Sequence, residues 1–167
     1  MELNLQLADM DDSFKIYIEQ LRDGREEHIE EKLDPVFLDI QDEDLKFEKP
    51  VELQGVAYLA DNELVLHWNI HTEALLPCSI CNEPVAVQVQ VQNFYYCVPT
   101  QEIKTGIYNF KELLRETILL ELPGFAECNQ GKCPKRKEYK KFLKELSDPL
   151  LEKEEGYQPF ADLDWKS

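Results

Sequence analysis

Two pairs of cysteines constrain this chain of 167 residues more than any other feature of its sequence. Two residues separate Cys78 from Cys81, and four separate Cys128 from Cys133. A pair with this spacing can span one edge of the tetrahedron that Zn²⁺ prefers, and two pairs complete the tetrahedron. The sequence therefore predicts a zinc site with Cys78, Cys81, Cys128 and Cys133 as its ligands.

The residues around the pairs favour the tight turns that such a site requires. Gly131 lies inside the second pair and can adopt backbone conformations closed to other residues. Pro77 precedes the first pair, and Pro123-Gly124 precedes the second. Because four thiolates leave no position for water, the predicted zinc is structural rather than catalytic.

Two alternatives for the cysteines stay open at this point. The thiols could be reduced and buried without a metal, or Cys78 and Cys81 could form a redox-active pair. Thioredoxin-like chemistry requires the pair at the start of a helix, whereas a valine-rich strand is predicted to follow Cys81.

The charge of the chain limits its partners. With 34 acidic and 18 basic residues, the net charge is -16. Phosphates repel such a chain at long range, so the composition favours basic partners such as ribosomal proteins. The N-terminal sequence has no basic, apolar leader, and no apolar run approaches the roughly 18 residues that span a bilayer. We expect a cytoplasmic protein that does not cross a membrane, with cysteines that bind metal rather than form disulfides.

Alternation of apolar and polar residues predicts several β-strands. The clearest lies at residues 85–91, where every second residue is valine, and it is expected to continue to Val98. Asp61-Asn62 is predicted to form the turn of a hairpin. The other predicted strands cover residues 1–10, 14–18, 51–60 and 63–73.

Three segments have the spacing of helices. Residues 109–121 place apolar side chains on one helical face, with Asn109 as the predicted N-cap. A short helix is predicted at 25–33, where Ile29 and Leu33 lie four residues apart, and another at 137–146.

The predicted fold class is α+β, a mostly antiparallel β-sheet with one long packing helix and a four-cysteine zinc site. Residues 1–146 are predicted to form one domain, with zinc knuckles at 78–81 and 128–133. Residues 147–167 are predicted to be an acidic, poorly ordered C-terminal tail.

One basic segment stands out in the acidic chain. Seven basic residues and a single acid, Glu138, lie between residues 132 and 144. Some of these cations would offset the charge of a four-thiolate zinc centre, which is −2. The others could contact phosphate, or form a solvated helix face without a ligand. The candidate residues for contact with RNA or a partner are Lys132, Lys135, Arg136, Lys137, Lys140 and Lys141.

No segment has the pattern of a known catalytic site. The sequence has no P-loop, dinucleotide fingerprint, nucleophile elbow or H-E-x-x-H motif. Close pairs of acids are expected by chance among 34 acidic residues. We therefore predict that the protein is not an enzyme.

Four segments carry a family resemblance. The first cysteine pair is followed by Glu83-Pro84-Val85, and residues 116–123 read ETILLELP. Cys128 to Pro134 has the form C-x4-C-P, and residues 159–163 read PFADL. In this order they resemble the YceD family, also called large ribosomal RNA subunit accumulation proteins. The chain departs from that family at Ser79-Ile80, where an arginine is usual.

Two further departures follow the second pair. Gly131-Lys132 replaces a usual Gly-Leu, and Lys135-Arg136-Lys137 replaces a frequent further Cys-Gly. The resemblance implies a bacterial cytoplasmic protein that supports accumulation or processing of large-subunit ribosomal RNA, without established catalytic residues.

The predicted function is therefore that of a non-enzymatic ribosome biogenesis factor. Its expected partner is a basic ribosomal protein or assembly factor, with RNA contact through the basic segment. Two alternatives remain, an acidic zinc-containing adaptor that binds a basic protein outside the ribosome, and an enzyme, either a thiol redox protein or a nuclease that acts on rRNA precursors.

Overall fold

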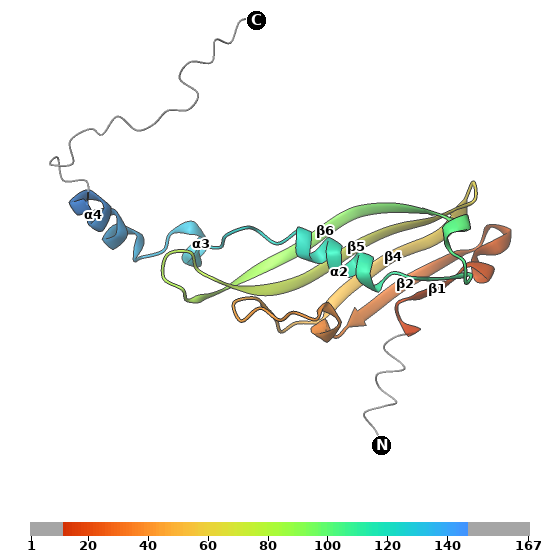
Figure 1. Ribbon diagram of the computed structural model, residues 1–167, viewed down its shortest axis with the longest axis horizontal. Helices are drawn as coiled ribbons and strands as arrows, with labels where there is room; N and C mark the ends of the chain where they lie inside the picture. Colours follow the sequence, from red (N-terminus) through yellow and green to blue (C-terminus); the bar gives the residue numbers. More distant parts are fainter. Residues whose placement is uncertain (1–11, 147–167) are drawn as a thin grey trace, which may run out of the picture.

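Two long strands, joined by the loop that carries the first cysteine pair, dominate the computed structural model (Figure 1). They are β5 (Glu63–Pro77) and β6 (Pro84–Pro99). The structure describes residues 12–146, with the side chains from 142 onward excepted. The predicted strand at 1–10, the predicted tail at 147–167 and the PFADL segment lie outside the described residues.

The main sheet is antiparallel throughout. Its strand order is β2 (Glu26–Leu33), β4 (Val51–Ala60), β5 and β6, and the short β3 (Lys46–Phe47) pairs with β5 past the end of β4. A second, two-stranded sheet pairs β1 (Lys15–Tyr17) with β7 (Ile107–Asn109).

The helical elements are short. The α-helices that lie within the described residues are α2 (Lys111–Leu120), α3 (Cys128–Gly131) and α4 (Arg136–Leu146). The 3-10 helices are η1 (Ile18–Gly24), η2 (Pro35–Leu38) and η3 (Thr100–Glu102). The α+β class with a mostly antiparallel sheet is confirmed, and α2 is the predicted packing helix.

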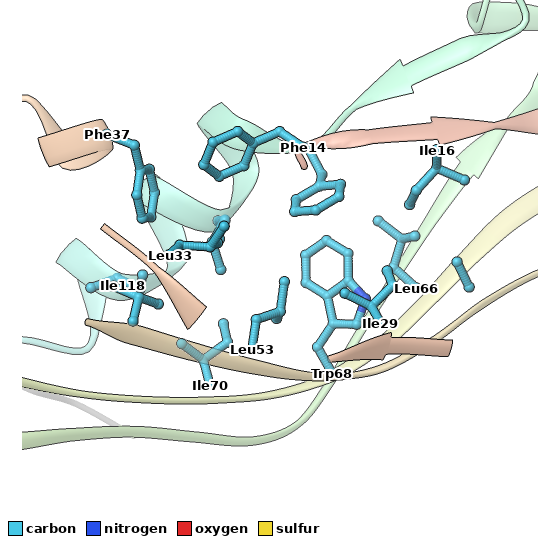
Figure 2. Packing of buried hydrophobic residues seen from close by; sticks show 14 of the residues in the cluster. Phe14, Ile16, Ile29, Leu33, Phe37, Leu53, Leu66, Trp68, Ile70 and Ile118 are labelled. Atoms are coloured by element: carbon cyan, nitrogen blue, oxygen red, sulfur yellow. The ribbon is translucent and has the colours of Figure 1, made fainter. Parts of the chain in front are cut away.

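The hydrophobic core lies between one face of the main sheet and the layer formed by α2, η2 and β1 (Figure 2). Trp68 of β5 packs against Phe110, with ring centroids 4.9 Å apart, and Phe14 contacts both Phe37 and Phe110. The Nε of Arg115 donates a hydrogen bond of 2.7 Å to the carbonyl of Leu38, which fixes α2 against η2. This core holds the β5–β6 hairpin and α2 in place. The first cysteine pair lies in the loop of that hairpin, and the second pair comes after α2 in the chain.

The prediction of a helix at 25–33 is wrong. The segment is strand β2, paired with β4 along its whole length. Ile29 and Leu33 are four residues apart, a spacing that puts both on one face of a strand as well as of a helix. Both are buried in the sheet core, and the edge of β4 supplies the hydrogen-bond partners that a helix would have supplied internally.

Other predicted elements agree with the structure in type and differ at their ends. Asp61 and Asn62 have φ values of 47° and 67°, as a two-residue type I′ hairpin turn requires. The predicted strand at 14–18 ends at Tyr17. The predicted helix at 109–121 runs from Lys111 to Leu120, so its N-cap is Phe110 and the prediction of Asn109 is wrong by one residue. The Oδ1 of Asn109 accepts from the amide of Lys111 at 2.9 Å.

We expect Gly55→Ala to destabilise the protein by about 3 kcal/mol, at the upper end of overpacking costs. A Cβ at this position of β4 would lie 2.2 Å from the carbonyl oxygen of His67 and 2.6 Å from the Cδ1 of Trp68. Because the first of these is backbone, β5 itself must shift. Urea unfolding measures the effect. Gly124→Ala is the control, since nothing lies within 4 Å of its added Cβ; equal midpoints for the two variants would contradict the prediction.

Glu27 places a carboxylate on the core side of β2. Its Oε2 is buried and has no hydrogen-bond partner among the described residues, and burial raises the pKa of this carboxyl above its usual 4.5. The folded state therefore holds the proton more tightly than the unfolded state, so stability falls as pH rises from the unfolded pKa through the folded one.

We expect Glu27→Gln to stabilise the protein at neutral pH and to flatten this pH dependence. The amide keeps the shape of the side chain and removes the charge that burial disfavours. Urea midpoints on either side of the pH window measure the effect. Glu30→Gln, on the exposed face of the same strand, is expected to change the urea midpoint little. An equal gain in stability in that variant would show that the effect does not come from the burial of Glu27.

Candidate metal centre

The four predicted cysteines converge. Their sulfur atoms all lie within 4.8 Å of one another, and the Sγ atoms of Cys81 and Cys128 are 3.7 Å apart. In a regular tetrahedron with metal–sulfur distances near 2.3 Å, two sulfurs are about 3.8 Å apart. The predicted convergence is confirmed, and the cluster can hold a metal ion.

The first pair is positioned by the turn between β5 and β6. Pro77 ends β5 and Pro84 begins β6, so Cys78 and Cys81 both lie in the connecting loop. The amide of Cys78 donates to the carbonyl of Glu83 at 2.8 Å, and the amide of Asn82 donates to the carbonyl of Cys78 at 2.9 Å. Antiparallel pairing of the two longest strands thus fixes the first knuckle.

The second pair is held by a run of left-handed residues. Asn129, Gln130 and Gly131 have φ values of 55°, 53° and 80°, and the amide of Lys132 donates to the carbonyl of Asn129 at 3.2 Å. The sequence pointed to Gly131 alone. Glutamine rarely adopts the left-handed conformation, so the presence of Gln130 in the sequence did not predict it.

Ser79 and Ala126 join the two knuckles. Cys78 and Ala126 form a parallel β-bridge. Both the amide and the hydroxyl of Ser79 donate to the carbonyl of Ala126, at 2.8 and 3.0 Å. The segment after α2 is therefore tied to the end of β5 by backbone bonds as well as by the thiols. No pattern in the sequence predicts this contact, because an alanine in a loop has no property that points to a partner.

The amides around Cys78 favour a thiolate there. The backbone N–H of Cys128 lies 3.4 Å from the Cys78 sulfur, and with those of Ile80 and Cys81 it lowers the pKa of this thiol to about 6. Burial and the neighbouring sulfurs raise the pKa of Cys128 to about 12. Four clustered thiols cannot all ionise without a cation, and a bound divalent cation reverses that balance.

Glu127 and Arg136 form an ion pair beside the second knuckle. The Oε1 of Glu127 accepts from the amide of Cys133 at 2.8 Å and from the Nε of Arg136 at 3.0 Å, and its Oε2 also contacts the guanidinium. Hydrogen bonding to Arg136 lowers the pKa of Glu127. Glu127 was not among the predicted site residues. Its position directly before Cys128 is the one signal in the sequence that could have pointed to it.

The predicted contact residues lie together at the end of the second knuckle and directly after it. All six side chains are exposed, and Arg136 is paired with Glu127. From this point α4 extends away from the sheet (Figure 1). The other five residues are Lys132, Lys135, Lys137, Lys140 and Lys141.

Within residues 12–146, no helix has the length and apolar character needed to cross a membrane.

Comparisons with known proteins find no relative on which to base the function. No protein-family model matches the chain, and neither the search of curated proteins nor that of solved structures finds a match. The assignment of the four-cysteine cluster as a metal site therefore depends on its geometry alone.

Proposed function

We propose that this protein is a non-enzymatic ribosome biogenesis factor that supports accumulation or processing of large-subunit ribosomal RNA. The observation that carries the proposal is where three of the four YceD-like segments lie. The first cysteine pair with residues 83–85, the end of α2 with residues 116–123, and Cys128 to Pro134 all surround the metal centre or lead into it. Segments remote in sequence thus serve one structural unit.

The proposed ion is structural zinc. Tetrahedral sites with four sulfur ligands bind zinc or iron, and four thiolates fill the shell, so no open position remains for chemistry. Metal analysis of protein purified without chelator identifies the ion. One zinc per chain is expected; iron, which gives coloured thiolate complexes, would contradict the choice of ion but not the site.

The two charged regions are proposed to have different partners. The acidic body, which is the chain before the basic segment at 132–144, would hold a basic ribosomal protein or assembly factor in the cytoplasm. The helix α4, which follows the metal centre and carries the exposed Lys137, Lys140 and Lys141, extends away from the sheet (Figure 1). That separation allows contact with RNA phosphate while the acidic residues face a protein.

Purification of the tagged chain from its own cells at moderate salt tests the proposal. We expect large-subunit ribosomal RNA and proteins in the eluate, and a lowered ratio of large- to small-subunit RNA in cells without the gene. An eluate without large-subunit components, together with a normal RNA ratio, would contradict it.

The net charge of -16 favours one alternative, an acidic adaptor for a basic protein outside the ribosome. The same eluate separates the two functions, because an adaptor would recover a non-ribosomal basic protein and no ribosomal RNA.

A further inference from the structure

The main sheet has two edges of opposite character. One is β2 and the other is β6, which within residues 12–146 pairs with β5 alone. Five of the eight residues of β2 are charged, and none of the 16 residues of β6 is. Charged side chains on an edge strand oppose pairing with another chain, and a long edge without them invites it.

We propose that the free edge of β6 pairs antiparallel with the same edge of a second copy of this chain, on a two-fold axis at Gln88. In this register Val85 faces Val91 and Val87 faces Val89 on the core side of the sheet. Val85, Val87 and Val91 are half-buried in the single chain, so pairing would cover apolar surface from both copies. The inference is independent of the ribosomal role.

The ends of the straight part of β6 fit this axis. Pro84 begins the strand, and the pairing with β5 is irregular between Val91 and Phe94. There Asn93 has a left-handed φ of 54°, and its amide donates to the Oδ1 of Asn69 at 2.9 Å, within the sheet rather than toward a partner. The regular stretch is therefore 85–91, and its midpoint is Gln88.

Charge favours a second copy over a basic partner at this edge. β6 has no acid that would attract a basic strand. The surface that it offers for pairing is its valine face, which is complementary to the same face of a second copy. Two copies of net charge -16 repel each other at long range. Salt screens that repulsion, so dimerisation is expected to strengthen as salt is raised, whereas pairing with a basic strand would weaken.

Sedimentation velocity over a range of protein and salt concentrations tests the proposal. We expect a monomer–dimer equilibrium that shifts toward dimer at high salt. Gln88→Lys should raise the dimer Kd by about tenfold, since two like charges meet at the axis. The fold should survive, because the Gln88 amide already donates to Glu73, which a lysine can contact in its place.

Gln54→Lys is the matched control. It makes the same change of charge at an exposed position of β4, away from the edge, and should leave the Kd near that of the natural chain. A mixture of Gln88→Lys and Gln88→Glu chains should recover the dimer as a heterodimer. A chain that stays monomeric at every salt concentration would overturn the proposal, as would equal effects of the two lysine variants or a dimer that weakens with salt.

Discussion

Cys81→Ser is expected to abolish binding of the proposed metal and to open the knuckle region while the main sheet stays folded. Structural zinc contributes about 10–16 kcal/mol in small peptides, so losing one of the four proposed thiolate ligands is expected to remove a large stabilising term from this region. The hydrophobic core includes none of the four cysteines. We therefore expect the unfolding to be local, with residues 122–136 losing their protection from hydrogen exchange and β4 and β5 keeping theirs.

Cys97→Ser is the matched control for this prediction. Cys97 is half-buried on β6, paired opposite Val65, and does not belong to the cluster. The substitution Cys97→Ser makes the same chemical change, and the metal content and hydrogen exchange should remain those of the natural chain. Cys81→Ser protein that retains a full equivalent of metal and unchanged protection would contradict the site. Global unfolding would instead show that the sheet depends on the metal.

The two cysteine pairs could be recognised as metal ligands because the spacing within each pair is a local property of the sequence. Cys78 and Cys81 are set in place by a turn, and Cys128 and Cys133 by a second one. What joins the turns was not predictable. Ser79 and Ala126 meet through backbone and hydroxyl bonds, and neither residue type is typical of a zinc site.

The prediction of strands succeeded where one face of the strand is buried and the other face is exposed to solvent. Val85, Val87 and Val89 alternate with exposed residues, so their period is unambiguous. In β2 only Ile29 and Leu33 are apolar and buried, and two positions four apart satisfy both periods. Only the partner strand β4 decides between them, and pairing between distant segments is not encoded locally.

The paired substitution Lys137→Glu and Lys140→Glu is expected to weaken association with large-subunit RNA. Both side chains are exposed three residues apart on α4, so one strand of phosphates can reach them together. Each lost phosphate contact lowers the slope of log affinity against log salt by about 0.7 for a single strand. Two contacts lower it by about 1.4, which titration of a labelled RNA at several salt concentrations measures. Glutamate is as good a helix former as lysine, so α4 should persist.

Lys46→Glu with Lys104→Glu is the control for bulk charge. Both side chains are exposed and lie outside the basic segment, Lys46 on β3 and Lys104 in the turn before β7, and the pair changes the net charge by the same amount. If the two double variants lose affinity equally, the effect is long-range repulsion from a more acidic chain. If neither loses affinity, α4 is a solvated helix and any ribosomal role depends on the acidic body. Loss in the α4 variant alone would give the basic segment a direct RNA contact, because only position then distinguishes the two proteins.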